Sequence, residues 1–194
     1  MVSIGNGLGF ARRVRLVATL FITCGVPGSG KTILAKRLEA EQRAVRLTGD
    51  EWLHELYPNE SDEALNAQLP LVERLQWVNA HRPLVERLQW ALALRTLALG
   101  VNVVLDWGLW TREERDRYRT EAQEHKARVV LCVLDLPPRD ELVRRLNKRN
   151  AALPAGTFRI DEALLDYGLR WFERPTSAEL ALFDDARTFS LDDV

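Results

Sequence analysis

Short apolar runs alternate with longer amphipathic stretches along the 194-residue chain. Runs rich in valine, leucine, isoleucine and threonine lie at 16–23, 44–48, 101–106 and 128–135, with a weaker one at 187–191. Short apolar runs of this kind are typical of strands buried in a parallel sheet. The stretches between them carry apolar residues at helical spacing. This alternation predicts an α/β fold with a mainly parallel sheet covered by helices.

Local signals indicate where several of these helices begin and end. Thr111 and Glu114 have the spacing of a capping box, which predicts a helix beginning at Thr111. Pro138 is expected to open another helix, and Gly100 to end the one before the third strand. Residues 161–172 are helical in pattern. Helices are therefore expected to follow most of the predicted strands.

An exact duplication lies inside one helical stretch. Residues 70–77 (the first copy) and 83–90 (the second copy) both read PLVERLQW, a period of 13 residues. This period is too short for the usual solenoid repeats, so a recent tandem duplication is the simplest account. Thirteen residues advance a helix by about 1300°, which is about 220° beyond three full turns. The two copies therefore cannot present the same face on one straight helix.

A proline separates the two copies. Pro83 disfavours helical geometry at Arg82, and we expect a break or kink there. The second copy is expected to be structural and the first to be an added helical segment. The side chains expected to face the core lie within and beyond the second copy: Leu88, Leu92, Thr96 and Leu99.

Gly25–Thr32 carries the most specific motif in the chain. It reads GVPGSGKT and fits the pattern of a phosphate-binding loop, Gly, four free positions, then Gly-Lys-Ser/Thr. Glycines let successive N–H groups converge on one anion, and a helix beginning here adds its positive end. Lys31 can reach the β- and γ-phosphates of ATP, and Thr32 can ligate Mg²⁺. The remaining candidate nucleotide contacts are Gly25, Pro27, Gly28, Ser29 and Gly30.

Composition bounds the partners of this site. Hydrophobic residues make up 46% of the chain and charged residues 28%, with a formal charge of −1. These values favour a single globular domain, residues 1–194 with a flexible leader at 1–14, and indicate no general attraction to nucleic acid or membranes. Cys24 and Cys132 lie in apolar runs, which favours reduced thiols and a cytoplasmic location.

The N-terminus allows a competing interpretation. Arginines near its start, followed by an apolar run ending at Cys24, superficially resemble a secretory or lipoprotein signal. Cleavage there would remove the strand that precedes the phosphate-binding loop, so we disfavour export.

Two carboxylates follow predicted strands. Asp50 comes after the second strand and Asp106 ends the third, and ligands of open α/β sheets bind at such strand ends. Asp50 is either catalytic or the N-cap of the next helix, and we favour catalysis. Trp52, Trp107 and Trp110 also follow strand ends, where they could line the pocket of a sugar or ring-bearing acceptor or belong to the core.

Over residues 16–174 the chain resembles the small P-loop kinases that include zeta toxins, chloramphenicol phosphotransferase and the kinase domain of phage polynucleotide kinase. It is most similar to the AAA-type bacterial ATPases grouped with them. Gly25–Thr32 carries most of the resemblance, supported by Val104–Gly108 and Arg115. The resemblance implies a three-layer sandwich with a mainly parallel five-stranded sheet, a helical insertion at 58–82 and a lid at 145–160.

The same resemblance implies roles for individual residues. Asp50 would be the general base toward a substrate hydroxyl, while Asp106 would help to build the acceptor site. Arg115 would join Trp107 and Trp110 in contacting the substrate. Arg145 and Arg149 would stabilise the transferring phosphoryl group. These two arginines are four residues apart, so one helix face could direct both at one site, although a solvated basic face is the alternative.

The segment after Asp50 departs from one branch of this group. Polynucleotide kinases follow the base within a few residues by an arginine that handles the acceptor phosphate, whereas this chain has Glu51-Trp52-Leu53-His54. A polynucleotide acceptor is therefore disfavoured. His54 is a weak candidate to replace that arginine, because a single histidine beside leucines is more often a packed residue.

Together these patterns predict an ATP- and Mg²⁺-dependent phosphotransferase that acts on a hydroxyl of a small molecule. The alternatives are a nucleotide-dependent ATPase switch without a small acceptor, and a polynucleotide 5′-hydroxyl kinase. The latter would require a basic groove, of which a chain with formal charge −1 gives no sign. The identity of the acceptor, the choice between ATP and GTP and the oligomeric state stay open.

Overall fold

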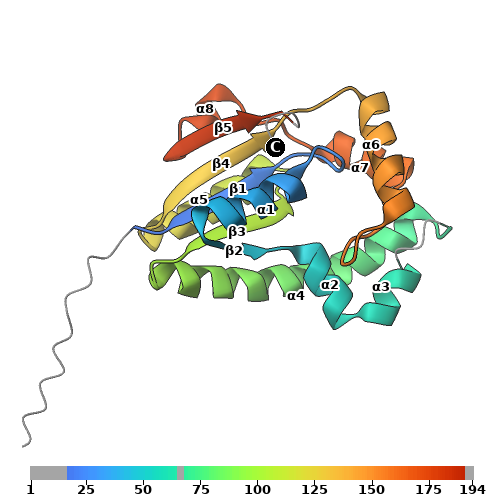
Figure 1. Ribbon diagram of the computed structural model, residues 1–194, viewed down its shortest axis with the longest axis horizontal. Helices are drawn as coiled ribbons and strands as arrows, with labels where there is room; N and C mark the ends of the chain where they lie inside the picture. Colours follow the sequence, from blue (N-terminus) through green and yellow to red (C-terminus); the bar gives the residue numbers. More distant parts are fainter. Residues whose placement is uncertain (1–16, 65–67, 191–194) are drawn as a thin grey trace, which may run out of the picture.

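A single parallel sheet organises the computed structural model, which describes residues 17–64 and 68–190. The predicted leader at 1–14 lies outside the described residues. The sheet has the strand order β2-β3-β1-β4-β5, and every strand pair is parallel. Its strands are β1 (Thr19–Cys24), β2 (Ala44–Leu47), β3 (Asn102–Gly108), β4 (Arg128–Leu134) and β5 (Asp185–Phe189). The predicted parallel five-stranded sheet is thus confirmed (Figure 1).

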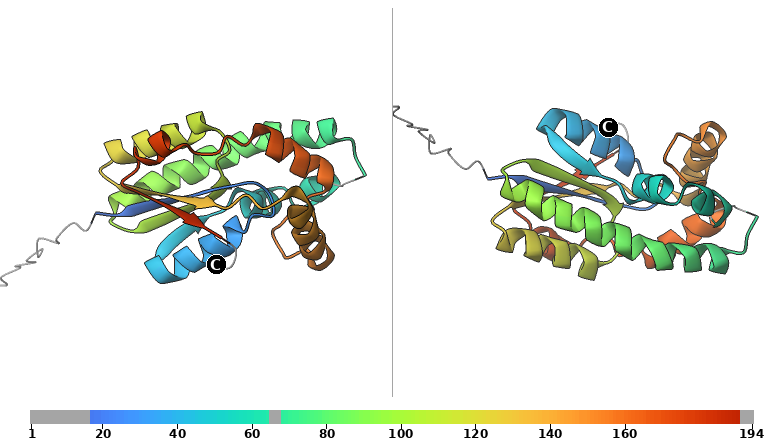
Figure 2. Two further views of the ribbon diagram at one scale, coloured as in Figure 1. Left: turned by 90° about the horizontal axis from the view of Figure 1, so that it is seen from above. Right: turned by 90° about the horizontal axis from the view of Figure 1, so that it is seen from below.

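Helices cover both faces of this sheet, as the predicted three-layer sandwich requires. α1 (Lys31–Gln42) lies on one face, while α4 (Leu71–Ala98) and α5 (Arg112–Glu124) lie on the other (Figure 2). Successive side chains of β1 serve the two faces in turn: Phe21 packs in the α1 core, and Leu20 and Ile22 pack in the core under α4 and α5. β1 lies at the centre of the sheet, so the loop after it is held from both sides.

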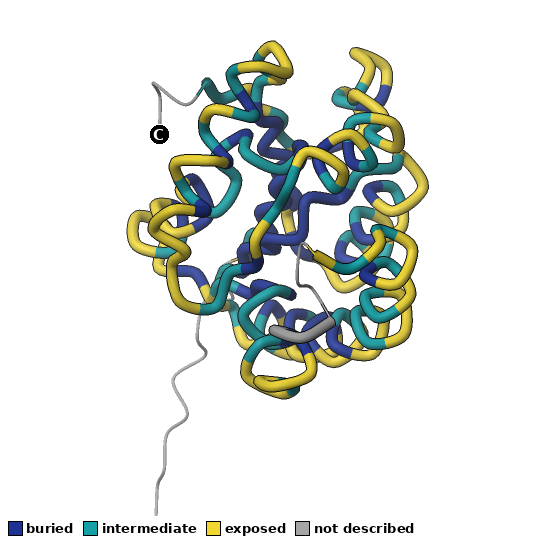
Figure 3. The backbone as a smooth tube through the Cα atoms, turned by 90° about the vertical axis from the view of Figure 1, so that its right-hand side faces the viewer, coloured by how far each residue is buried: buried dark blue, intermediate teal, exposed yellow. Residues whose placement is uncertain are grey.

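The remaining helices are mostly grouped at the carboxyl ends of the strands. They are α2 (Gly49–Leu56), α3 (Pro58–Ala64), α6 (Arg139–Ala152) and α7 (Glu162–Trp171), with the short α8 (Ser177–Leu180) lying before β5. Viewed from this end, buried chain lies at the centre and half-buried or exposed helices surround it (Figure 3). None of the described helices is long and apolar enough to cross a membrane.

The helix that contains the duplication is continuous. α4 runs through Pro83 for 28 residues, so the break predicted at Arg82 does not occur, while the alternative of a kink stays a prediction. Proline forfeits only one backbone hydrogen bond, to the carbonyl of Asn79, and both residues are exposed to water. Packing on either side outweighs this loss, because Arg74 pairs with Asp161 and Val85 is buried.

The predicted core face of α4 is also wrong. Leu88, Leu92 and Leu99 are exposed. The Thr96 hydroxyl donates a hydrogen bond to the carbonyl of Leu92 in its own helix. The buried side chains from the second copy onward are instead Val85, Gln89, Trp90, Ala93 and Leu97. A glutamine lies in this core because its amide is satisfied there, donating to the Thr48 carbonyl and accepting from the Trp107 indole.

Candidate nucleotide and acceptor site

The phosphate-binding loop joins β1 to α1 in a conformation that requires glycine. Gly28 and Gly30 have φ angles of 80° and 103°, in the left-handed region. A side chain on Gly25 would place its Cβ only 2.7 Å from the Ser29 hydroxyl oxygen. Val26 packs beneath α6 and α7 in a small apolar cluster. The loop is therefore fixed by backbone geometry and by packing before any ligand arrives.

Lys31 is the central cation of this loop. Its ammonium donates a 2.8 Å hydrogen bond to the Val26 carbonyl. Burial lowers the pKa of Lys31, while the carboxylates of Asp106 and Asp50 oppose that shift. The hydroxyl of Ser29 is buried and has no hydrogen-bond partner among the described residues. The loop thus carries a charged donor, Lys31, and a buried hydroxyl, Ser29, that has no partner among the described residues. Both can donate hydrogen bonds to a bound anion.

Asp106 lies beside the threonine of the loop. Its carboxylate is 1% exposed and lies 3.4 Å from the Thr32 hydroxyl, 3.5 Å from the Thr48 hydroxyl and 3.5 Å from Arg46 Nη1. Burial raises the pKa of Asp106, and Lys31 and Thr32 act in the opposite direction. These partners surround the carboxylate, and its predicted contribution to the acceptor site stays a prediction. Its pairing with a threonine hydroxyl fits the oxygen ligands that Mg²⁺ prefers.

Asp50 lies at the edge of this charged group. Thr48 is the N-cap of α2, so the N-cap interpretation of Asp50 is wrong. The Asp50 carboxylate instead accepts a 2.8 Å hydrogen bond from Arg82 Nη2, and it is 41% exposed. Its negative charge opposes the burial that lowers the pKa of Lys31 and of Arg149. Asp50 is thus both near the phosphate-binding loop and accessible.

The two arginines of α6 have different surroundings. Arg149 donates to the carbonyl of Phe158 at 3.0 Å, and its buried Nε has no partner among the described residues. Burial lowers the pKa of Arg149, whereas Asp50 opposes the shift. Arg145 is held by Glu141 at 2.6 Å, and Arg144 and Arg145 together lower the pKa of Glu141 to about 2. The charge of Asp50 thus acts on Arg149.

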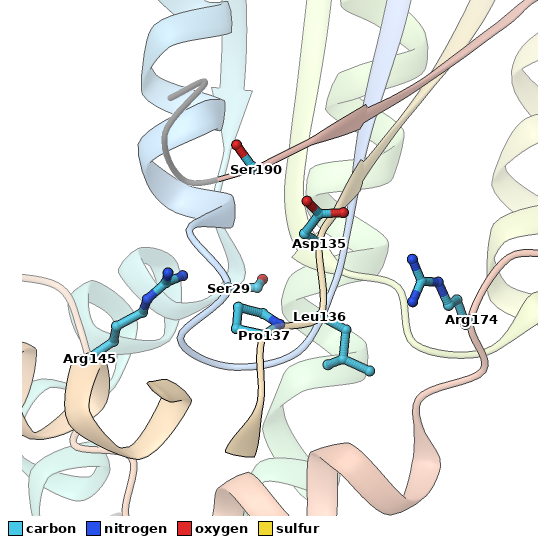
Figure 4. Close-up of a pocket in the computed structure, with 7 residues that line it drawn as sticks. All are labelled: Ser29, Asp135, Leu136, Pro137, Arg145, Arg174 and Ser190. Atoms are coloured by element: carbon cyan, nitrogen blue, oxygen red, sulfur yellow. The ribbon is translucent and has the colours of Figure 1, made fainter. Parts of the chain in front are cut away.

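A cavity of about 300 Å³ lies on the other side of the loop. In Figure 4, Arg145 and Arg174 stand on opposite sides of the segment that follows β4. Sequence reasoning missed Asp135, although it ends the predicted fourth strand as Asp106 ends the third. The residues that line the cavity are Ser29, Asp135, Leu136, Pro137, Arg145, Arg174 and Ser190.

Comparison with known families identifies this arrangement. The sequence pattern of the AAA domain family matches residues 20–175, which is most of the chain. The chain belongs to the AAA domain family. A search among curated proteins finds no match to this AAA domain protein.

Solved structures with the same fold include kinases. Kti12 of Chaetomium thermophilum, in complex with ADP-AlF3, is 18% identical with a TM-score of 0.65, and 90% of each chain is covered. The PezAT toxin–antitoxin system of Streptococcus pneumoniae is 17% identical with a TM-score of 0.63, covering 92% of this chain and 70% of that one. A gluconokinase from Sinorhizobium meliloti 1021 is 21% identical with a TM-score of 0.52, covering 90% and 84%. The AAA domain protein therefore has the fold of the P-loop kinase group.

The tryptophans after β3 divide between core and site. Trp107 of the AAA domain protein is buried, donates to Gln89 at 2.7 Å and meets Tyr118 edge to face. Its predicted contact with substrate is wrong, because it belongs to the core under α4 and α5. Trp110 is half-buried, with its ring 6.3 Å from the ring of Tyr167. Its contact with substrate stays a prediction.

Arg115 supports the same loop from within. Its side chain is fully buried and makes a two-pronged ion pair with Glu179 at 2.6 and 3.0 Å. Its remaining nitrogen donates to the carbonyls of Leu109 and Trp110. The predicted substrate contact is wrong, because all three guanidinium nitrogens of Arg115 are occupied inside the AAA domain protein. Arg115 instead fixes the segment that leaves β3.

The segment predicted as a lid, 145–160, covers part of α2. A Cβ on Gly156 would lie 3.0 Å from the side chain of Glu51, and the Phe158 ring meets His54 edge to face at 5.8 Å. Phe158 also packs with Leu53 and Val85. The end of α6 and the loop after it thus lie close to the helix that carries Asp50.

Proposed function

We propose that this protein transfers the γ-phosphoryl group of ATP to a hydroxyl of a small-molecule acceptor. The observation that carries this proposal is the position of Asp50, an accessible carboxylate coupled to Lys31 of the phosphate-binding loop. A switch that only binds and hydrolyses nucleotide does not need an exposed carboxylate that a second substrate can reach. The AAA domain match and the kinase fold support nucleotide chemistry, while the acceptor is inferred from the site.

Nucleotide binding would involve both sides of the loop. The phosphates would replace the Val26 carbonyl as the partner of Lys31, and the Ser29 hydroxyl would gain a partner. The cavity beyond Ser29 is the proposed place for the nucleoside, where Asp135 can accept hydrogen bonds. Thr32 and Asp106 would hold Mg²⁺, which neutralises phosphate charge when it is bound.

The transfer step follows from these placements. The acceptor oxygen attacks the γ-phosphorus, the bond to the β–γ bridging oxygen breaks, and the hydroxyl proton passes to Asp50. Lys31 and Arg149 would stabilise the negative charge on the transferring group, and the buried Nε of Arg149, which has no hydrogen-bond partner among the described residues, can donate to it. Arg145 would act from the nucleoside side, next to the cavity that it lines.

Other features of the chain support this setting. The free thiols Cys24 and Cys132 are both buried, which suits a reducing compartment such as the cytoplasm. The formal charge of −1 supports a small acceptor over a nucleic acid. Nucleotide hydrolysis without an acceptor is the second candidate, because Kti12, a structural neighbour, was solved with ADP-AlF3.

Asp50→Asn tests the proposal against this second candidate. The ADP released from MgATP is measured with and without a library of hydroxylated metabolites, antibiotics and oligonucleotides. We expect Asp50→Asn to lower acceptor-dependent turnover by about 10²–10⁴-fold, because the general base is lost. ATP affinity should persist, since the loop is untouched. Stability should change by less than about 1 kcal/mol, because the Arg82 pair is partly exposed.

Lys31→Ala is the companion variant. It removes the charge set against the β- and γ-phosphates and should weaken ATP binding or abolish turnover. Unchanged ATP affinity together with unchanged turnover would remove the nucleotide site from Gly25–Thr32. Normal acceptor-dependent turnover in Asp50→Asn would remove Asp50 from the mechanism.

A further inference from the structure

Arg82 of α4 is the residue that contacts the proposed base. Its Nη2 donates to Asp50 Oδ1 at 2.8 Å, and its Nη1 lies 3.7 Å from Glu86. Burial disfavours the charge of Arg82, but the carboxylates of Asp50 and Glu86 outweigh it and raise its pKa. The contact joins residues 32 positions apart in the sequence. A permanent cation thus reaches Asp50 from a different helix.

The duplication supplies this arginine. The resemblance between the two units extends beyond the octapeptide, since residues 70–82 and 83–95 are identical at ten of thirteen positions. Arg82 closes the first unit as Arg95 closes the second. Arg95 is exposed on the far part of α4, whereas Arg82 meets Asp50. The repeated arginine therefore has a distinct environment in each unit.

Packing around Arg82 fixes the distance between α2 and α4. The rings of Tyr57, Trp77 and His81 form a cluster between the two helices, with centroids 4.4 to 6.0 Å apart. Trp77 and His81 belong to the same unit as Arg82. The first unit thus aligns its arginine with the helix that carries Asp50, and a planar guanidinium restrains the carboxylate that it contacts.

We propose that Arg82 is a positioning residue, which fixes Asp50 Oδ1 and leaves Oδ2 to accept the proton of the attacking hydroxyl. This inference rests on the proposed function. As the new oxygen–phosphorus bond forms, the bond to the β–γ bridging oxygen breaks, ADP leaves, and the proton moves to Oδ2. Without Arg82 the half-exposed carboxylate would sample other rotamers, and misplacement by about 1 Å can cost about 10²-fold in rate.

The test compares Arg82→Ala with Arg95→Ala, which removes the matching arginine of the other unit. The probe is MgATP with water as the acceptor, so that no acceptor has to be known. We expect Arg82→Ala to lower kcat by about 10²-fold with an unchanged KM for ATP. Arg95→Ala should match the wild type. Arg82→Lys should recover part of the kcat, because an ammonium keeps the charge without the planar fork.

Controls separate the possible failures. Arg82→Gln keeps the side-chain length and removes the charge, and circular dichroism checks that each variant is folded. The inference is overturned if Arg82→Gln and Arg82→Ala have the same kcat as Arg95→Ala while Asp50→Asn has lost activity. In that case Asp50 acts in the reaction without help from Arg82. A matching rise in KM, or a lower melting temperature that accounts for the loss, would make Arg82 structural and also overturn it. Wild-type hydrolysis in Asp50→Asn would instead refute the role of Asp50 in the proposed function.

Discussion

The two copies of PLVERLQW have identical sequences and opposite environments within one helix. In the second copy, the valine and the glutamine, Val85 and Gln89, are buried against the sheet. Their counterparts in the first copy, Val72 and Gln76, are exposed. The arginines show the reverse: Arg74 is buried, and its counterpart in the second copy is exposed. The 13-residue offset turns each copy by about 220°, so a continuous helix must bury different faces of the same octapeptide.

Each environment satisfies different polar groups. The Trp90 indole of the second copy donates to Glu121 at 2.5 Å, whereas the Trp77 indole of the first has no partner among the described residues. Arg74 reaches Asp161 at 2.9 Å, at the beginning of α7. Identical residues therefore contribute to the sheet core in one copy and to the α2–α4–α7 region in the other. Position along the helix, and not residue type, decides what each side chain does.

The tryptophans give the largest expected contrast. Trp90→Ala should destabilise the protein by about 3–5 kcal/mol, because a buried indole in the main core leaves a cavity. Trp77→Ala should cost clearly less, since that ring is only half-buried. Chemical denaturation of both variants measures the difference. Equal losses would show that the first copy packs as tightly as the second.

Deleting one unit sharpens the comparison. Removal of residues 70–82 or of residues 83–95 gives chains that differ at only three positions, because the units share the other ten. We expect the 70–82 deletion to fold and bind ATP, since the second copy keeps its place before β3. Phosphoryl transfer should fall by about 10²-fold, because the deletion removes Arg82. The arginine that remains, Arg95, keeps its own position and does not replace Arg82 beside Asp50. A deletion variant unfolded by circular dichroism would make the first copy integral to the core.

The two arginines of the copies should differ less. Arg74→Ala should cost about 2 kcal/mol, because it removes the cation paired with Asp161, whose carboxylate is 29% exposed and keeps its capping bond from the Leu164 N–H. Arg87→Ala should stay within about 0.5 kcal/mol, as expected for an exposed residue. Thermal denaturation of the two variants at one pH makes the comparison. A larger loss at Arg87 would reverse the assignment of faces.

The glutamines give the smallest contrast. Gln89→Leu leaves the Trp107 indole without an acceptor and should cost about 1 kcal/mol, offset in part by the added apolar surface. Gln76→Leu changes an exposed position and should be near neutral. Denaturant midpoints of the two variants test this. Equal midpoints would mean that the Trp107 indole finds another acceptor, such as water, with no loss of stability.

Local signals explain what the sequence could predict. The phosphate-binding loop, the strand runs and the capping box at Thr111 depend on neighbouring residues, and the capping box is present with both of its hydrogen bonds. Strand β5 begins at Asp185, earlier than expected, and the four-residue α8 was not predicted. Both are short elements at the end of the chain whose local patterns are weak.

Long-range partners explain what the sequence could not predict. Periodicity assigned the leucines of α4 to the core because it could not anticipate that Gln89 would find partners on Thr48 and Trp107. In the same way, no local pattern links Asp50 to Arg82 or Arg115 to Glu179. Within the candidate site, the loop follows from its motif, whereas the surroundings of the carboxylates and arginines required the fold.

The Arg115–Glu179 ion pair has a consequence for synthesis. The two residues are 64 positions apart, so a growing chain exposes Arg115 well before its carboxylate partner has been made. Until Glu179 emerges from the ribosome, burial of this guanidinium is unfavourable, since a single buried charge is costly. The segment around Leu109 and Trp110 then lacks the cation that holds its carbonyls. Arg115 can therefore hold the segment that leaves β3 only after Glu179 has been translated.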